Sequence, residues 1–144
     1  MSTVKSILEE KGRNVVTLPG SATLAEAVKL LAERRIGAAV ICDQKGAIKG
    51  ILSERDVVRA VAGSGADSLA MATSRFMTSK VRVCTEDHSV SEVMEIMTNG
   101  RFRHLPVERD GQLVGIISIG DVVKSRIESA VREVEDIRTY IATA

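Results

Sequence analysis

Residues 50–58 read GILSERDVV, and residues 115–123 read GIISIGDVV. In both segments a glycine and two apolar residues precede a Ser-x-x-Asp motif, which two valines follow. The apolar residues indicate the end of a strand, and a hydroxyl residue with an acidic residue three positions later is typical of a helix beginning. The chain therefore contains two copies of one strand–helix unit.

The repeat extends toward the N-terminus of each copy. Residues 23–28 read TLAEAV and align with residues 89–94, which read SVSEVM. Both segments predict an amphipathic helix that begins at a capping box, Thr23 with Glu26 in one copy and Ser89 with Glu92 in the other. Further apolar runs, joined in the second copy by an Asp-Gly turn signal at residues 110–111, predict a hairpin.

The predicted fold is therefore α+β, with two tandem β-α-β-β-α repeats and a C-terminal helix. Neither copy is long enough to bury a good core alone, so we expect the two to pack together. The predicted organisation is an N-terminal segment at 1–14, a first repeat at 15–62, a linker at 63–75, a second repeat at 76–127 and a C-terminal helix extension at 128–144.

The composition argues against several classes of protein. Of 144 residues, 44% are hydrophobic and 27% charged, as in an ordinary globular domain. Aromatic residues make up 2% and the formal net charge is +1, which disfavours stacking on single-stranded nucleic acid and electrostatic binding to nucleic acid or a membrane. No apolar run reaches the length of a membrane span, so we expect a cytoplasmic protein.

Each Ser-x-x-Asp motif has two interpretations. In the structural one, the serine and the aspartate cap a helix. In the functional one, the backbone N–H groups at the same helix N-terminus bind a phosphate, and the aspartate accepts hydrogen bonds from the two hydroxyls of a ribose. The sequence alone does not choose between them, because duplication preserves caps as well as sites.

The duplicated unit resembles the CBS repeat, the module named after cystathionine beta-synthase. The two segments that end in Asp-Val-Val carry the resemblance, together with residues 103–107, RHLPV, and it extends over roughly residues 15–125. It implies two repeats related by a pseudo-twofold axis with two clefts between them. The ligands it implies are AMP, ADP or ATP above all, with NAD(H) or S-adenosylmethionine as further possibilities, and no metal is required.

The resemblance also implies which residues bind the ligand. In the cleft around Asp121, it places this aspartate on the ribose and Ser118 near the sugar and phosphate. It places Ile116, Thr17, Ala22, Ile36 and the backbone of Gly37 and Ala38 around the adenine, and Arg103 and His104 at the phosphates. Alternation along a strand would put Arg103 and Arg101 on the side opposite to His104.

The second cleft would be formed by Asp56, Ser53 and Ile51, with Val83, His88, Phe102 and Arg103 from the other repeat. Val83 stands where the first copy has Thr17, and His88 stands where it has Ala22. Because a histidine is bulky at a place meant for adenine, the sequence ranks the Asp121 cleft first.

The C-terminal residues carry an apolar stripe at heptad spacing: Val123, Ile127, Ala130, Val134, Ile137 and Ile141. One interpretation is a helix that packs on its own domain. The stripe extends beyond what the repeat itself needs, so we expect a homodimer contact.

We expect a non-catalytic regulatory module that binds an adenine nucleotide and signals by a conformational change to a protein partner that the sequence does not identify. No nucleophile–base pair and no metal-ligand spacing indicates an enzyme. The alternatives are a structural dimerisation module without a ligand and an S-adenosylmethionine sensor.

Overall fold

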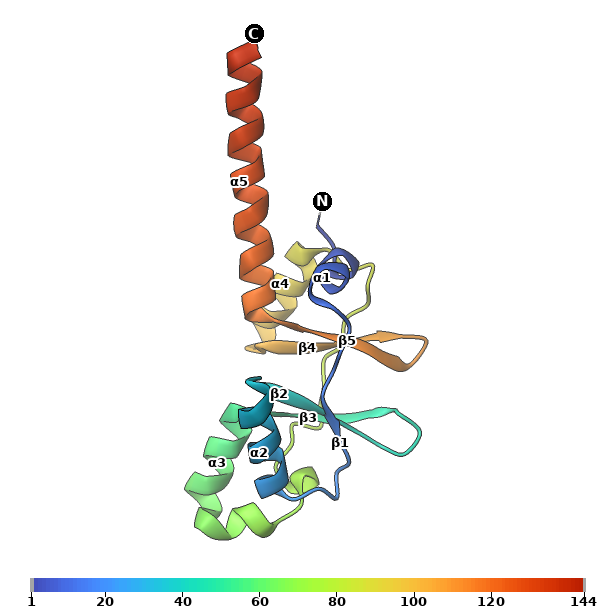
Figure 1. Cartoon of the computed structure of the whole chain (residues 1–144). Helices are drawn as coiled ribbons and strands as arrows, with labels where there is room; N and C mark the ends of the chain where they lie inside the picture. Colours follow the sequence, from blue (N-terminus) through green and yellow to red (C-terminus); the bar gives the residue numbers. More distant parts are fainter. Residues whose placement is uncertain (1, 144) are drawn as a thin grey trace.

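Each of the two sequence copies forms a small sheet flanked by helices in the computed structural model, which describes residues 2–143 (Figure 1). The predicted α+β class with a C-terminal helix is confirmed. In chain order the elements are α1 (Val4–Lys11), β1 (Thr17–Leu18), α2 (Leu24–Arg34), β2 (Ala38–Cys42), β3 (Ile48–Ser53), α3 (Glu54–Ser64), the 3-10 helices η1 (Gly65–Ala70) and η2 (Thr73–Arg75), α4 (Val90–Gly100), β4 (His104–Arg109), β5 (Gln112–Ser118) and α5 (Ile119–Thr143).

The predicted capping boxes set where α2 and α4 begin. Thr23 Oγ1 accepts the backbone N–H of Glu26 at 3.2 Å, and the Glu26 carboxylate accepts the Thr23 N–H at 3.2 Å. Ser89 and Glu92 form the same pair of bonds at 3.0 and 3.1 Å. Each box satisfies backbone donors that the first helical turn leaves without a partner, so both predictions are confirmed.

The two sheets differ by one strand because a proline replaces a donor. In the first half, β1 lies parallel to β2, and Val40 donates its N–H to the carbonyl of Val16 at 3.0 Å. Pro106 occupies the equivalent position in β4 and has no N–H. Cys84 therefore makes only an isolated bridge to this edge, and β4 pairs with β5 in a two-stranded sheet.

The turn between β4 and β5 has the backbone that the Asp-Gly signal predicts. Asp110 has φ 52° and Gly111 has φ 78°. A two-residue turn with both residues in the left-handed region matches the twist of a β-hairpin, so this prediction is confirmed.

The two halves exchange segments to complete their cores. Helix α1 precedes the first repeat in the chain but packs against the second half, where Val4 and Leu8 join its core (Figure 1). Residues 65–77 precede the second repeat and pack against the first half through Leu69, Phe76 and Met77. Because the second core needs α1, which comes before the whole first half in the chain, the two halves form one interlocked unit.

The exchanged segment at residues 65–77 approaches β3 closely enough to require a glycine. A Cβ on Gly50 would lie 2.5 Å from Met77 Sδ, at the end of this segment, and 2.9 Å from the carbonyl oxygen of the next residue, Thr78; side chains do not adopt such distances without movement. We expect Gly50→Ala to lower the free energy of unfolding by about 1–3 kcal/mol, measured by urea denaturation. The control is Gly63→Ala in α3, where no atom lies within 4 Å of the new Cβ, and it is expected to be neutral or stabilising. Equal stability of Gly50→Ala and wild type would contradict this packing.

Candidate functional site

Both Ser-x-x-Asp motifs lie at a strand–helix junction and form the same cap. At the start of α3, Asp56 Oδ2 accepts the Ser53 N–H at 2.9 Å and Ser53 Oγ accepts the Asp56 N–H at 3.4 Å. At the start of α5, Asp121 Oδ2 accepts the Ser118 N–H at 2.9 Å and Ser118 Oγ accepts the Asp121 N–H at 3.2 Å. The structural interpretation of the motifs is therefore correct in both copies, and what differs is the remaining environment of each aspartate.

Asp56 has a neutral second partner. Thr78 donates its hydroxyl to Asp56 Oδ1 at 3.3 Å. Two backbone hydrogen bonds, of 3.0 and 2.9 Å, hold Thr78 against Ile51 of β3. The Asp56 side chain is buried, and the residue is 7% exposed. A hydroxyl both donates and accepts, so this arrangement can rearrange around the hydroxyls of a sugar.

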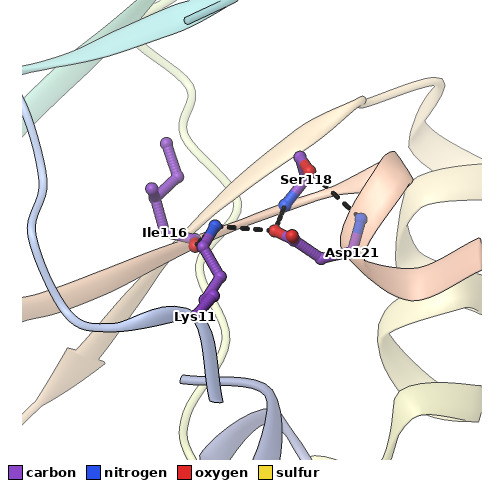
Figure 2. A network of polar contacts seen from close by, with 4 residues as sticks. All are labelled: Lys11, Ile116, Ser118 and Asp121. Carbon is purple, nitrogen blue, oxygen red and sulfur yellow. Dashed lines mark hydrogen bonds and ion pairs between the residues drawn. The ribbon is translucent and has the colours of Figure 1, made fainter. Parts of the chain in front are cut away.

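Asp121 has a cationic second partner. The Lys11 ammonium donates to Asp121 Oδ2 at 2.7 Å and to the carbonyl oxygen of Ile116 at 3.0 Å (Figure 2). Partial burial works to raise the pKa of the Asp121 carboxyl, but the hydrogen bonds from Lys11 and the Ser118 backbone outweigh it and lower this pKa below its usual value. The Asp121 carboxyl is therefore ionised, and its negative charge is paired with the Lys11 ammonium of the same chain.

A cavity of about 420 Å³ opens beside Asp56, between the two halves. Its lining comes from β3 and α3 on one side and from the end of α4 and the start of β4 on the other. Ile51 and Phe102 give it apolar surface, and Ser53, Asp56 and Thr78 give it hydrogen-bonding groups. The remaining lining residues are Gly37, Glu54, Arg55, Arg59, Gly100, Arg101, Arg103 and His104.

The charge of this cavity favours an anion. Four arginines line it against two carboxylates. It also lies at the N-terminus of α3, where backbone N–H groups and the positive end of the helix dipole favour negative charge. Apolar surface, a buried carboxylate and several arginines together suit a flat ring, a sugar and a phosphate.

The structure separates the residues that the resemblance assigned to two clefts. Seven of them line the cavity at Asp56: Gly37, Ile51, Ser53, Asp56, Phe102, Arg103 and His104. The others lie elsewhere: Asp121, Ser118 and Ile116 are in the Lys11 network, Thr17 pairs with Val40, Ala22 is buried and accepts the Thr73 N–H, half-buried Ile36 donates its N–H to Leu31, and Ala38 pairs with Ser53 at the start of β2.

Asp121 lines a small cavity on the side of α1 and α5, which is not the counterpart of the cavity at Asp56. It has a volume of about 80 Å³ and is bounded by residues of α1 and α5. His88, which the sequence placed in the Asp56 cleft, accepts the Thr85 N–H at 2.9 Å through Nδ1 and lines a separate hollow beside α4. The histidine that lowered the rank of the Asp56 cleft is engaged in this local turn.

Sequence reasoning missed Thr78, Arg55 and Arg59, and it separated Arg101 and Arg103 from His104. Strand alternation does not apply to these three residues, because β4 begins only at His104. Arg101 is the cap residue of α4 with φ 56°, and this left-handed turn brings all three to one cavity. The i, i+4 spacing of Arg55 and Arg59 on α3, next to Asp56, is the signal that could have added those two.

His104, which lines the cavity, is a titratable residue whose pKa is shifted in the folded chain. A Cβ on Gly37 would lie 3.1 Å from its Cε1 atom, so the ring packs where the two halves meet. Burial is the main cause that lowers the pKa of the imidazole below its usual 6.5, opposed by Glu54 and reinforced by Lys11. The folded chain therefore favours the neutral ring.

This lowered pKa predicts a loss of stability in mild acid. Below the pKa of the unfolded chain, about 6.5, unfolded protein binds more protons at this position than folded protein does. His104 therefore does not reduce the free energy of unfolding above that pH, and it reduces this free energy as the pH decreases toward the pKa of the folded chain. We expect His104→Gln to lose less stability than wild type between about pH 7.5 and pH 5.5, measured by urea denaturation. Identical pH profiles for the two proteins would exclude this role for His104.

Three further findings bear on the site. No helix in residues 2–143 is long and apolar enough to cross a membrane. Within the same residues, no group of three His, Cys, Asp or Glu side chains is placed to hold a metal ion. The family model of the CBS domain matches residues 4–63 and 73–128.

Several solved structures are similar to this chain over most of its length. The CBS-domain containing protein ATU1752 from Agrobacterium tumefaciens is 50% identical, with a TM-score of 0.84 over 87% of this chain and 93% of that one. The CBS domain protein PAE2072 from Pyrobaculum aerophilum, complexed with AMP, is 30% identical, with a TM-score of 0.74 over 83% and 88%. The CBS domain pair of protein MJ0100, in complex with 5'-methylthioadenosine and S-adenosyl-L-methionine, is 27% identical, with a TM-score of 0.78 over 90% and 98%.

Proposed function

The chain belongs to the CBS domain family, and on that premise we propose that it is a non-catalytic regulatory module that binds an anionic adenine nucleotide in the Asp56 cleft. CBS-pair proteins are regulatory, and two similar structures hold adenine-containing ligands. We propose AMP, ADP or ATP as the ligand class, and NAD(H) shares the anionic phosphates that this cleft favours.

The observation that carries the proposal is the cavity of about 420 Å³ at Asp56. Its lining supplies a place for each part of a nucleotide: Ile51 and Phe102 for the ring, Asp56 for the ribose, and Arg103 with the α3 N-terminus for the phosphate. We therefore propose the Asp56 cleft as the primary site, in place of the Asp121 cleft that the sequence ranks first.

The same lining argues for a nucleotide over S-adenosylmethionine. That compound carries a sulfonium and an ammonium against one carboxylate, so its net charge is positive. A cleft with four arginines and two carboxylates repels such a ligand and attracts a phosphate. S-adenosylmethionine is therefore expected to bind more weakly than AMP, and so is 5'-methylthioadenosine, which has no phosphate for the arginines to bind.

Ligand binding would change the relative orientation of the two halves, and the regulated partner would respond to this change. The cleft takes Asp56 and Thr78 from one half and Phe102 and Arg103 from the other. A nucleotide held by both halves stabilises one relative orientation over others, which is the unequal affinity for two states that regulation requires. The regulated partner would bind a surface whose shape depends on this orientation.

We also propose that the protein is a homodimer in which two α5 helices pair in parallel. Helix α5 extends well beyond the rest of the chain (Figure 1). Three residues of its heptad stripe, Ile127, Ile137 and Ile141, are 59%, 59% and 68% exposed, so apolar side chains are exposed along one face of the helix. A second copy is the occupant that a heptad stripe on one face of a helix fits.

The charges beside the seam favour the parallel orientation. In a parallel pair, Glu133 of one helix faces Arg138 of the other, an attractive contact that occurs twice. An antiparallel pair that aligns the whole seam places Lys124 beside Arg138 and two Glu133 side chains beside each other. These like charges disfavour that alternative.

A thermal-shift panel tests the ligand proposal. The panel contains AMP, ADP, ATP, NAD, NADH, 5'-methylthioadenosine and S-adenosylmethionine, each with the wild-type chain. A ligand present at 100 times its Kd adds about 2.7 kcal/mol of stability, which is readily measured. We expect the phosphorylated compounds to raise Tm more than the other two. The absence of any shift would favour the structural dimerisation module, with both motifs acting as helix caps only.

A further inference from the structure

The two clefts are equivalent in sequence, but different groups contact the aspartate in each. At Asp56, the neighbouring strand residue Ile51 is paired with the backbone of Thr78. At Asp121, the equivalent residue Ile116 receives the Lys11 ammonium on its carbonyl oxygen, and the same ammonium reaches the carboxylate. A cation from the chain itself thus stands where the first half has a neutral threonine.

The position of Lys11 is set by the packing of α1. Val4 and Leu8 of this helix are buried in the second core. Leu8 lies against β5 so closely that a Cβ on Gly115 would be 2.8 Å from its Cδ2 atom. The helix ends where Gly12, with φ 99°, donates its N–H to the Leu8 carbonyl at 2.8 Å. Lys11 therefore projects from a fixed helix end toward Asp121 (Figure 2).

Resting on the proposed function, we propose that Lys11 closes the Asp121 cleft, so that the module binds one nucleotide per chain. Asp121 Oδ2 already accepts from the Ser118 N–H and from the Lys11 ammonium, so this oxygen has no free lone pair for a ligand. A ribose that donates one hydroxyl to each oxygen of this carboxylate must displace the ammonium from its charge-assisted hydrogen bond to Oδ2. Lys11 is thus a specificity-determining residue, and it makes the two clefts of one duplicated unit different.

Lys11 also lines a small space on the side of α1 and α5. This space has a volume of about 80 Å³ and is bounded by residues of these two helices. Glu10 and Lys124, which line it as well, form an ion pair between α1 and α5 at 3.6 Å. Both acceptors of the Lys11 ammonium, the Asp121 carboxylate and the Ile116 carbonyl, belong to the chain itself.

Isothermal titration with AMP as the probe tests the proposal through the number of sites. We expect wild type to bind one AMP per chain and Lys11→Met to bind two, the new site weaker than the first by about tenfold. Lys11→Arg keeps a cation of similar reach and is expected to stay at one. Lys45→Met removes a positive charge from the β2–β3 turn and is expected to match wild type.

The outcomes separate the closing role of Lys11 from the proposed AMP site at Asp56. One site in both wild type and Lys11→Met overturns the closing role of Lys11 and leaves the Asp56 site standing. Two sites in wild type, or loss of binding in Lys11→Met, overturns it as well. No site in wild type and one in Lys11→Met retains the closing role but removes the Asp56 proposal. No binding by either protein rejects both.

Discussion

Replacing Asp56 with alanine is expected to raise the Kd for AMP by at least about a hundredfold. The substitution removes the carboxylate that faces the cavity and would accept the ribose hydroxyls. Hydrogen bonds to a charged group contribute about 1.5–3 kcal/mol each, and two of them correspond to a factor of a hundred or more. Isothermal titration of wild type and variant with AMP measures the ratio directly.

A matched variant separates this effect from the loss of a helix cap. Asp56→Ala and Asp121→Ala each remove the same capping contact, and each is expected to cost about 1 kcal/mol of stability. Only Asp56→Ala is expected to weaken AMP binding, because Lys11 keeps Asp121 out of the site. A large loss of affinity in Asp121→Ala together with normal binding by Asp56→Ala would reverse the assignment of the clefts.

Introducing a glutamate at Ile137 is expected to convert the dimer to a monomer. Ile137 lies in the seam of α5 and is 59% exposed in the single chain. In a pair, the substitution loses an apolar contact worth about 1.5–3 kcal/mol in each chain and places two like charges opposite each other. The dimer Kd should rise by well over a hundredfold, which sedimentation equilibrium measures.

The control for this variant is Thr139→Glu, which adds the same charge to α5 away from the seam. It is expected to remain dimeric. The Asp56 cleft is lined by one chain, so Ile137→Glu is expected to keep its AMP site even as a monomer. A monomeric wild type at about 50 µM, or a dimeric Ile137→Glu, would contradict the α5 seam as the interface.

The parts of the fold that local chemistry decides could be predicted from the sequence. The capping boxes at Thr23 and Ser89 depend on residues three positions apart, and both are present. The Asp110-Gly111 turn depends on two residues with positive φ. Because the same pattern occurs in both copies, each copy supports the elements predicted for the other. The α+β repeat could therefore be predicted from the sequence.

The features that depend on distant segments could not be predicted in this way. The Lys11–Asp121 contact joins the end of α1 to the start of α5, and no local pattern pairs them. The exchange of α1 and residues 65–77 between the two cores has the same character. The sequence therefore ranked the clefts by the bulk of one local residue, His88, and could not include the contact between Lys11 and Asp121.

The arginines of the Asp56 cavity could not be placed from the sequence pattern either. Alternation was applied to residues 101–104 as if all were in a strand, but the first of them caps α4 in the left-handed region. One residue outside the strand is enough to change the face to which a side chain points. The concentration of arginines at the Asp56 cavity therefore emerged only from the backbone of this turn.

The most direct test of nucleotide binding at Asp56 is a titration of isotope-labelled protein with AMP, followed by nuclear magnetic resonance of the backbone amides. We expect the amides of Gly37, Thr78 and Phe102 to shift together along one saturating curve, because these residues line the cavity at Asp56. Shifts centred on Ser118 and Asp121, with Gly37, Thr78 and Phe102 unchanged, would contradict it, and so would a spectrum that AMP leaves unaltered.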